Sequence, residues 1–234
     1  MVTDLVQLSL SELEKLYREY GKFITSERLQ LFDRMITYRT KHLTVVLEDI
    51  YQSHNASAVI RTCDCFGIQN LHVIENRNIY NINPDVAVGS SKWVDLYRYR
   101  GKPENTIDCY DTLRKQGYKI IATLPHEKNV LLDQLDISQK TALVFGTEKL
   151  GLSATAINEA DGFVKIPMYG FTESFNISVS VALAIFHLSE RMRQSNLPWQ
   201  LSEIEQLQTK IRWIRNTVKQ PEQLEKELLK RIKE

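Results

Sequence analysis

The chain has 234 residues, of which 43% are hydrophobic and 25% are charged, and its formal net charge is +1. This size and composition are ordinary for a globular protein and accommodate one substantial domain with appended helices. No apolar run approaches the roughly 18 residues that span a bilayer, and the start, Met1-Val2-Thr3-Asp4, lacks the basic-then-apolar order of a signal peptide, so we expect a cytoplasmic protein with no membrane partner.

The first forty residues are predicted to form two short helices. Two candidate capping-box pairs open the first helix, namely Ser9 with Glu12 or Ser11 with Glu14. Gly21 separates the two helices, and the second begins near Thr25 or Ser26. We treat residues 1–42 as an amino-terminal helical extension.

From Leu43 onward, short apolar runs alternate with helical stretches, which is typical of a parallel sheet covered by helices on both faces. The predicted strands are Leu43–Leu47, Leu71–Ile74, Val94–Tyr99, Lys119–Thr123, Ala142–Phe145 and Phe163–Ile166. The predicted helices are Ala56–Phe66, Thr106–Gln116, Ala154–Ala160 and Ile177–Arg193. Because the order is β-α-β throughout, we predict an α/β domain over residues 43–195 with a mostly parallel sheet.

A second, carboxyl-terminal helical extension is predicted over residues 196–234. Its first helix is expected at Ser202–Lys219, and Pro221 interrupts the helical pattern before a final charged stretch. No internal repeat or low-complexity linker is present.

Positive charge is concentrated in the two ends of the chain. Residues 1–42 carry 7 basic and 6 acidic side chains, residues 187–234 carry 10 and 7, and the part between them is net acidic. This asymmetry indicates a polyanion partner that the ends contact. The candidate phosphate contacts are Arg28, Arg34, Arg39, Lys41, Arg191, Arg193, Arg212 and Arg215. A solvated helical face explains any single one of these residues equally well.

The turns that leave the strands are the candidate site, because ligands of open parallel sheets bind at the carboxyl ends of the strands. After the first strand comes Ser53-His54-Asn55-Ala56, where Asn55 can cap a helix that carries Arg61 nearly two turns inside it. Taken alone, a plain cap and a solvated charge explain these two residues.

The three cysteines, Cys63, Cys65 and Cys109, show no zinc-ligand spacing, so we expect buried thiols and no metal site.

Two later turns are also unusual. The strand that ends at Phe145 is followed by Gly146-Thr147-Glu148-Lys149-Leu150-Gly151, in which turn glycines and a surface carboxylate are the plain interpretation. The last strand leads through Ile166-Pro167-Met168 and a long loop into an almost uncharged helix. Polar side chains that enter this apolar element need hydrogen bonds, so they are candidate ligand contacts: Ser174, Asn176, Ser178 and Ser180.

Two common nucleotide-binding motifs are absent from the sequence. The turn after the first strand reads Glu48-Asp49-Ile50-Tyr51-Gln52 and contains no glycine, which argues against a dinucleotide-binding loop. No glycine-lysine-Ser/Thr sequence occurs either, which excludes a P-loop.

The three turns, in this order, resemble the three signature motifs of the TrmH-type (SpoU) branch of the SPOUT methyltransferase family. The resemblance covers roughly residues 25–195 and includes Leu43-Thr44-Val45-Val46-Leu47-Glu48 and Gly89-Ser90-Ser91-Lys92-Trp93-Val94. The string Arg61-Thr62-Cys63-Asp64 is similar to that of enzymes that methylate the D-loop guanosine at position 18 of tRNA. Two positions depart from the family pattern, since Ser53 replaces the usual proline and Phe175 the usual leucine. The second change is expected to reshape the adenine pocket slightly.

The resemblance implies methylation of a ribose 2′-hydroxyl in RNA, with S-adenosylmethionine as cofactor and no metal. It implies a homodimer and a deep trefoil knot near the carboxyl end of the sheet, made where the second and third motifs thread through each other. Val179, Val181, Leu183 and Ile185 are expected to supply apolar surface for the dimer. The catalytic set by resemblance is Arg61, Asn55, Glu148, Ser174 and Asn176, and the cofactor pocket is Thr123, Leu124, Gly146, Ile166, Met168 and Phe175.

The family mechanism places the arginine that matches Arg61 beside the acceptor hydroxyl. A fixed cation stabilises the alkoxide charge that develops there, whereas a guanidinium pKa above about 12 makes arginine a reluctant base, so we favour electrostatic activation.

Other readings of the chain are an rRNA 2′-O-methyltransferase, a catalytically silent RNA-binding protein on the same scaffold, and an unrelated α/β binding domain. The first would keep every core residue and differ only in what the extensions bind.

Overall fold

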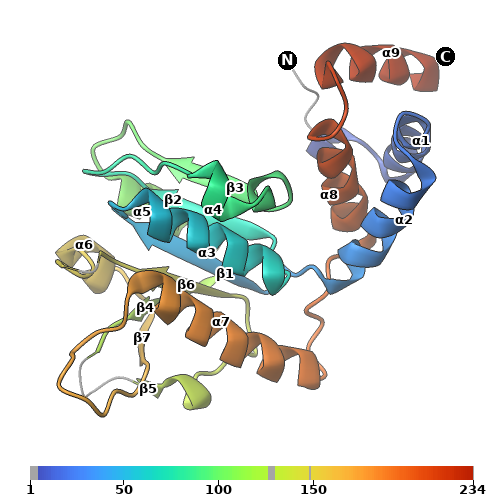
Figure 1. Cartoon of the computed structure of the whole chain (residues 1–234). Coiled ribbons are helices and arrows are strands. Elements are labelled where there is room, and N and C mark those ends of the chain that lie inside the picture. Colours follow the sequence, from blue (N-terminus) through green and yellow to red (C-terminus); the bar gives the residue numbers. More distant parts are fainter. Residues whose placement is uncertain (1–4, 126–129, 148, 234) are drawn as a thin grey trace. The chain divides into compact units, whose positions relative to one another are not determined.

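A parallel sheet forms the centre of the larger part of the chain. In the computed structural model, which describes residues 5–125, 130–147 and 149–233, seven strands form one sheet in the order β3-β2-β1-β6-β4-β7-β5 (Figure 1). Neighbouring strands are parallel throughout. The strands are β1 (Leu43–Glu48), β2 (Asn70–Ile74), β3 (Asp95–Tyr99), β4 (Lys119–Thr123), β5 (Val130–Leu131), β6 (Thr141–Phe145) and β7 (Gly162–Lys165). The predicted mostly parallel α/β sheet is confirmed, and β5 is additional to the predicted strands.

The sheet is buried on both faces, as its uninterrupted apolar strands require. All six residues of β1 are buried. Val45 and Leu47 face a core layer that includes residues of α3 (Ser53–Cys65) and α7 (Ile177–Gln194). Val46 faces the opposite layer, which includes residues of α5 (Asn105–Lys115) and α6 (Ala154–Asn158). In Figure 1, α3 and α7 lie over the same face of the sheet.

The predicted β-α-β order is wrong at one crossover. Between β4 and β6, the described residues form β5 and a single 3-10 turn, Leu132–Gln134, instead of an α-helix. The connection from β2 to β3 contains only the short helix α4 (Pro84–Ala87) and another 3-10 turn, because Val88 (φ 49°) and Gly89 (φ 79°) adopt left-handed conformations that end α4 after one turn. Elements this short leave no periodic pattern in the sequence.

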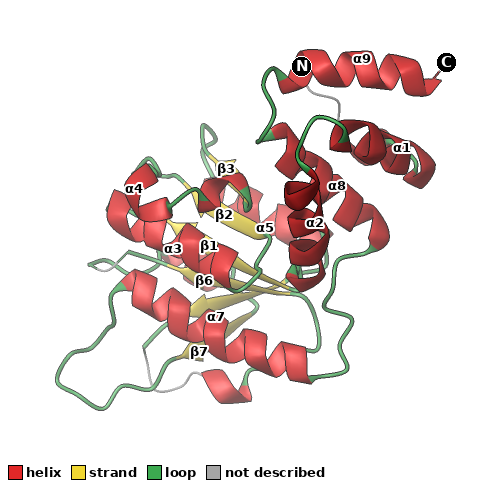
Figure 2. Cartoon of the chain, turned by 45° about the vertical axis from the view of Figure 1, so that its right-hand side comes forward, coloured by secondary structure: helices red, strands yellow, loops and turns green. Residues whose placement is uncertain are grey.

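The two terminal segments form one helical unit. The chain divides into a sheet unit, Thr40–Trp199, and a terminal unit made of residues 1–39 and 200–234. The terminal unit contains α1 (Leu10–Gly21), α2 (Ser26–Met35), α8 (Glu203–Arg215) and α9 (Pro221–Lys233), as Figure 2 shows. Within it, α1 contacts both α8 and α9, and the Tyr20 hydroxyl donates a 2.8 Å hydrogen bond to the Glu225 carboxylate. The two predicted extensions are therefore joined by packing across the whole length of the sequence.

Helix starts follow their capping residues. Ser9 and Glu12 form the predicted capping box of α1, and Ser202 with Glu205 forms another at α8. Thr25 caps α2. Asn55 does not cap α3, because this helix begins at Ser53 with Gln52 at the N-cap. Within the part of the chain that the structure describes, no helix combines the length and apolar character needed to cross a membrane.

Candidate functional site

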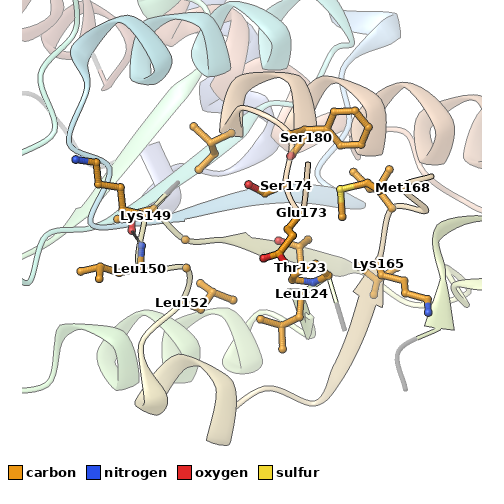
Figure 3. A pocket seen from close by; sticks show the side chains of 18 of the residues that line it. Thr123, Leu124, Lys149, Leu150, Leu152, Lys165, Met168, Glu173, Ser174 and Ser180 are labelled. Atoms are coloured by element: carbon orange, nitrogen blue, oxygen red, sulfur yellow. Dashed lines mark hydrogen bonds between the residues drawn. The ribbon is translucent and has the colours of Figure 1, made fainter. Parts of the chain in front are cut away.

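A pocket of about 400 Å³ lies at the carboxyl ends of β4, β6 and β7 (Figure 3). The structure brings together in its lining all the residues predicted for the cofactor pocket: Thr123, Leu124, Gly146, Ile166, Met168 and Phe175. Ser174 also lines it. The position agrees with the rule that parallel sheets bind ligands where their strands end.

Hydrogen bonds join the ends of the three strands that line the pocket. The Thr123 hydroxyl donates to the Val144 carbonyl at 2.8 Å, which ties the end of β4 to β6. The Leu124 amide donates to the Val164 carbonyl at 3.0 Å, which ties the same strand end to β7. The pairing of β4 with β7 therefore extends to Leu124, one residue beyond β4, and these hydrogen bonds hold the backbone that lines the pocket.

The loop after β6 requires glycine at two positions. Thr147 and Gly151 exchange backbone hydrogen bonds at 3.0 Å in both directions, which closes the loop tightly. A Cβ atom on Gly146 would lie 2.2 Å from the Gly151 carbonyl carbon, so only glycine fits there. Gly151 itself has a φ of 66°, which glycine adopts without strain. Glu148, expected in the catalytic set, lies outside the described residues.

Asn55 and Asn176 meet beside the pocket. Asn176 is the N-cap of α7, and its Oδ1 accepts a hydrogen bond from the Ser178 amide at 2.9 Å. Its Nδ2 donates to Oδ1 of Asn55 at 3.1 Å, which joins the first turn of α3 to the start of α7. Asn176 does not line the pocket, but its sequence neighbours Phe175 and Ile177 do. Of the four polar residues predicted to need hydrogen bonds, Asn176 and Ser178 form them. The expected burial is wrong for Ser174 and Asn176, which are exposed.

Arg61 stands apart from these groups. It lies on α3, is exposed, and does not line the pocket. No hydrogen bond or ion pair holds its guanidinium among the residues that the structure describes. The cation is therefore available to a ligand that approaches α3 from solvent.

Several arginines predicted to contact phosphate are engaged in internal contacts. The Arg191 guanidinium donates to the carbonyls of Leu132 (3.1 Å) and Leu135 (2.9 Å). Arg193 donates to the Phe66 carbonyl at 3.0 Å and lies 4.6 Å over the Trp199 ring. These two guanidinium groups anchor the end of α7 to the sheet unit, so we remove them from the candidate RNA contacts.

In the terminal unit, three more arginines that were predicted to contact phosphate have partners within the protein. Arg39 lies 5.2 Å over the ring of Trp213, and Arg215 forms a 2.6 Å ion pair with Glu225, whose side chain is buried. Arg212 donates to the Thr209 hydroxyl at 2.9 Å. Thr209 lies three residues from Arg212 on the same helix, but the partners of Arg39 and Arg215 depend on how the terminal helices pack, so sequence spacing does not reveal them.

Arg28 and Arg34 remain candidates for phosphate contact, because both are exposed on α2. Lys41, at the start of the sheet unit, is partly exposed and takes part in an interaction within the chain. Exposed positive charge on α2 is suited to a polyanion partner.

The apolar surface of α7 differs from the predicted one. Val181 and Ile185 are fully buried in the core of their own chain, so their assignment to a dimer face is wrong. Val179 and Leu183, which were also predicted for that face, are exposed with 43% and 39% of their surface accessible, and Phe186 joins them with 55%. Their spacing of four and three residues places them on one stripe of the helix.

Some pocket residues were not singled out from the sequence. Lys149, Leu150 and Leu152 line the pocket from the loop after β6, and Lys165 lines it from the end of β7 (Figure 3). Glu173 lines it from the third motif, and so does Ser180, which the sequence had already given as a candidate ligand contact. The sequence signal that could have identified them is that they belong to the same turns as Gly146 and Ser174.

Among the described residues, no cluster of histidine, cysteine or carboxylate side chains is suited to hold a metal ion.

The chain matches known proteins over most of its length. It is 45% identical over 199 residues to a Borreliella burgdorferi protein named tRNA (guanosine(18)-2'-O)-methyltransferase, which covers 85% of this chain and 89% of that relative. A Thermus thermophilus protein of the same name is 32% identical over 74% of this chain and 87% of its own length. Among solved structures, the A. aeolicus TrmH/SpoU tRNA modifying enzyme has a TM-score of 0.73 at 27% identity, covering 83% of this chain and 98% of that one.

The family comparison agrees with the resemblance expected from the three motifs. The model of the SpoU rRNA methylase family matches residues 42–186, a span that includes all three motif turns and the whole pocket lining. Since this match covers more than half of the sequence and the relatives exceed 30% identity, the chain belongs to the SpoU rRNA methylase family.

Proposed function

We propose that this protein transfers a methyl group from S-adenosylmethionine to the ribose 2′-hydroxyl of guanosine 18 in tRNA. The observation that carries the proposal is the 45% identity, over 89% of the relative, to a protein named for this reaction. The pocket at the strand ends supports it independently, because every residue expected to hold the cofactor lines that one pocket.

The pocket fits the cofactor in size and chemistry. A volume of about 400 Å³ falls within the usual range for sites that enclose small ligands. Leu124, Leu152 and Met168 offer apolar surface to a flat ring, and the glycine-lined loop exposes peptide groups beside it. When bound, S-adenosylmethionine supplies an electrophilic methyl group.

Arg61 is proposed to act on the acceptor. A ribose hydroxyl is a poor nucleophile, so a fixed cation beside it stabilises the negative charge that develops on its oxygen. Arginine keeps its proton at neutral pH, so Arg61 acts by electrostatic stabilisation, and the hydroxyl proton passes to a phosphate of the RNA or to water as the oxygen takes the methyl group. Asn55 and Asn176 hold the start of α3 against the start of α7. Ser174 and Glu148 belong to the proposed catalytic set by family resemblance.

The test is a methylation assay on separated RNA pools. We expect label from S-adenosylmethionine in the tRNA pool, and mapping should place it on the ribose of guanosine 18. Label confined to rRNA would instead identify a ribosomal RNA enzyme on the same scaffold. Binding of tRNA without any transfer would identify a silent RNA-binding protein.

The terminal unit is proposed to bind the tRNA. Arg28 and Arg34 supply exposed positive charge on α2, and phosphate contacts dominate the affinity of proteins for nucleic acids. Residues 1–42 thus serve as the RNA-binding extension of a catalytic domain over residues 43–195, and residues 196–234 form a helical extension that packs with them. With tRNA as its substrate, the protein is proposed to act in the cytoplasm.

A homodimer and a trefoil knot complete the proposal. The stripe of Val179, Leu183 and Phe186 offers an apolar surface to a second copy of the chain. The loop after β6 and the segment that enters α7 line the same pocket, which supports the knot that the family resemblance implies between them. Tracing the chain in an experimental density map tests the knot directly, because an unthreaded path from β6 to α7 would contradict it.

A further inference from the structure

Gln52 occupies the N-cap of α3 but does not cap this helix. Its backbone is extended (φ −87°, ψ 118°), and its side chain accepts no hydrogen bond from the amides of the first turn. Helix caps are usually serine, threonine, aspartate or asparagine, whose short side chains reach those amides. The Gln52 side chain instead receives a hydrogen bond from Nδ2 of Asn55 at 3.0 Å.

This contact extends the pair of asparagines into a row of three side-chain amides. Asn176 donates to Asn55 at 3.1 Å, and Asn55 donates to Gln52 at 3.0 Å. One end of the row lies at the start of α7, and the other lies at the start of α3. Asn55 is buried, whereas Gln52 is exposed at the edge of the site.

The direction of the row is determined by a single peptide group. The backbone N–H of Ser178 can only donate, so the Asn176 atom that faces it at 2.9 Å must be oxygen. The Asn176 amide nitrogen therefore points to Asn55, which must present its oxygen. The Asn55 nitrogen then points to Gln52, which must also present oxygen. The row thus requires a hydrogen-bond acceptor at position 52, and Gln52 supplies it.

We propose that Gln52 is a positioning residue for methyl transfer, which holds Asn55 and, through it, Asn176. This inference rests on the proposed function. Asn176 stands between Phe175 and Ile177, which line the pocket, and Asn55 belongs to the helix that carries Arg61. An acceptor at position 52 keeps the Asn55 amide in the orientation that joins the two elements. Loss of the acceptor leaves the buried Asn55 Nδ2 without this partner, at a cost comparable to that of a broken hydrogen bond.

Two variants of nearly equal size separate the acceptor from other properties of the side chain. Gln52→Glu keeps an oxygen acceptor toward Asn55, and Gln52→Leu removes it. Ser53→Ala is the matched control, because Ser53 is an exposed neighbour in the first turn whose hydroxyl makes no hydrogen bond within the described residues. Single-turnover methylation of tRNA, affinity for S-adenosylmethionine, affinity for tRNA and the melting temperature are measured for each variant.

We expect Gln52→Leu to lower the single-turnover rate by about fivefold to tenfold, with both affinities and the melting temperature close to those of the unaltered protein. Gln52→Glu and Ser53→Ala should retain the full rate. An equal rate in Gln52→Leu and the unaltered protein overturns the proposal, and so does an equal loss in Gln52→Leu and Gln52→Glu. A loss of tRNA affinity alone would identify Gln52 as an RNA contact instead.

A double-variant cycle tests whether Gln52 acts through Asn55. In an Asn55→Ala background, Gln52→Leu should change the rate by less than about twofold, because residues that act as one unit are not additive. A further fivefold loss in that background would show that Gln52 acts by another route and would overturn the proposal. Absence of methylation by the unaltered protein and by Ser53→Ala would refute the proposed function itself, so the two failures are distinguishable.

Discussion

Arg61 is the residue on which the proposed chemistry depends. It is exposed on α3 and lies outside the lining of the pocket. We therefore expect Arg61→Ala to lower the single-turnover rate of methyl transfer on the order of a hundredfold or more, since removing one group that stabilises developing charge has this effect. Calorimetry should show unchanged affinity for S-adenosylmethionine. Near-normal turnover in this variant would remove Arg61 from the catalytic set.

His72 gives the fold a dependence on pH. It lies on β2, stacked 4.9 Å from the ring of Tyr97 and 3.0 Å from the Tyr99 hydroxyl, and burial lowers its pKa to about 3. An unfolded histidine has a pKa near 6.5. The unfolded state therefore binds more protons between about pH 6.5 and pH 3, and stability that is present above pH 6.5 is lost as the pH falls through this window.

The His72→Phe variant isolates this contribution. We expect the free energy of unfolding of the unaltered protein to fall by about 2 kcal/mol more between pH 7 and pH 5 than that of the variant. Burial raises the pKa of the neighbouring Tyr99, so its hydroxyl stays neutral in this range. Denaturant titrations at the two pH values provide the measurement. Parallel losses in both proteins would show that other groups dominate acid sensitivity.

At the scale of elements, α7 combines three tasks in one helix. Its start holds Asn176 beside the pocket, its buried side covers the sheet with Val181 and Ile185, and its exposed side carries an apolar stripe. A helix with apolar residues on opposite sides gives no clear amphipathic signal, because neither side contrasts with the other. The exposed stripe therefore becomes visible only when the core contacts of the helix are known.

The stripe predicts the oligomeric state. We expect the protein to sediment at roughly twice its chain mass of 27.2 kDa. Leu183→Glu places a charge in the stripe of Val179, Leu183 and Phe186, so it should shift the equilibrium to monomer. Gln116→Glu, which adds the same charge at an exposed position after α5, is the control and should stay dimeric. A dimer that tolerates Leu183→Glu would place the interface elsewhere.

At the scale of the whole molecule, the chain separates a sheet unit from a helical terminal unit. The pocket belongs to the sheet unit, and the exposed charges of Arg28 and Arg34 belong to the terminal unit. Affinity for RNA and affinity for the methyl donor should therefore respond to different substitutions.

Charge reversal on α2 tests this division. Arg28→Glu combined with Arg34→Glu should weaken tRNA binding, and each lost phosphate contact should reduce the slope of log affinity against log salt by about 0.7 to 0.9. Affinity for S-adenosylmethionine should remain unchanged. Lys115→Glu, an exposed reversal on α5, serves as the control for a charge reversal outside α2. An unchanged salt slope in the double variant would mean that α2 is structural and that RNA is bound elsewhere.

The sequence by itself determined the parallel sheet and the helix starts at Ser9 and Thr25, and its resemblance to a known family indicated six residues of the pocket. These features are local: apolar runs mark buried strands, Ser9 with Glu12 marks a helix start, and the turns after parallel strands converge at one edge of the sheet. Thr123, Gly146 and Met168 are far apart in the chain, but each ends or follows a strand, and the sheet places β6, β4 and β7 side by side.

Tertiary structure decided which predicted groups remain available and how the elements are joined. Arg39, Arg191 and Arg215 had the same local signature as Arg28, but packing gives them a tryptophan ring, backbone carbonyls and a buried carboxylate as partners. The sequence also did not reveal that both chain ends form one unit, or that a row of side-chain amides ends at Gln52. Such contacts join residues separated by tens to hundreds of positions, whereas periodicity and capping report only on neighbours within a turn or two.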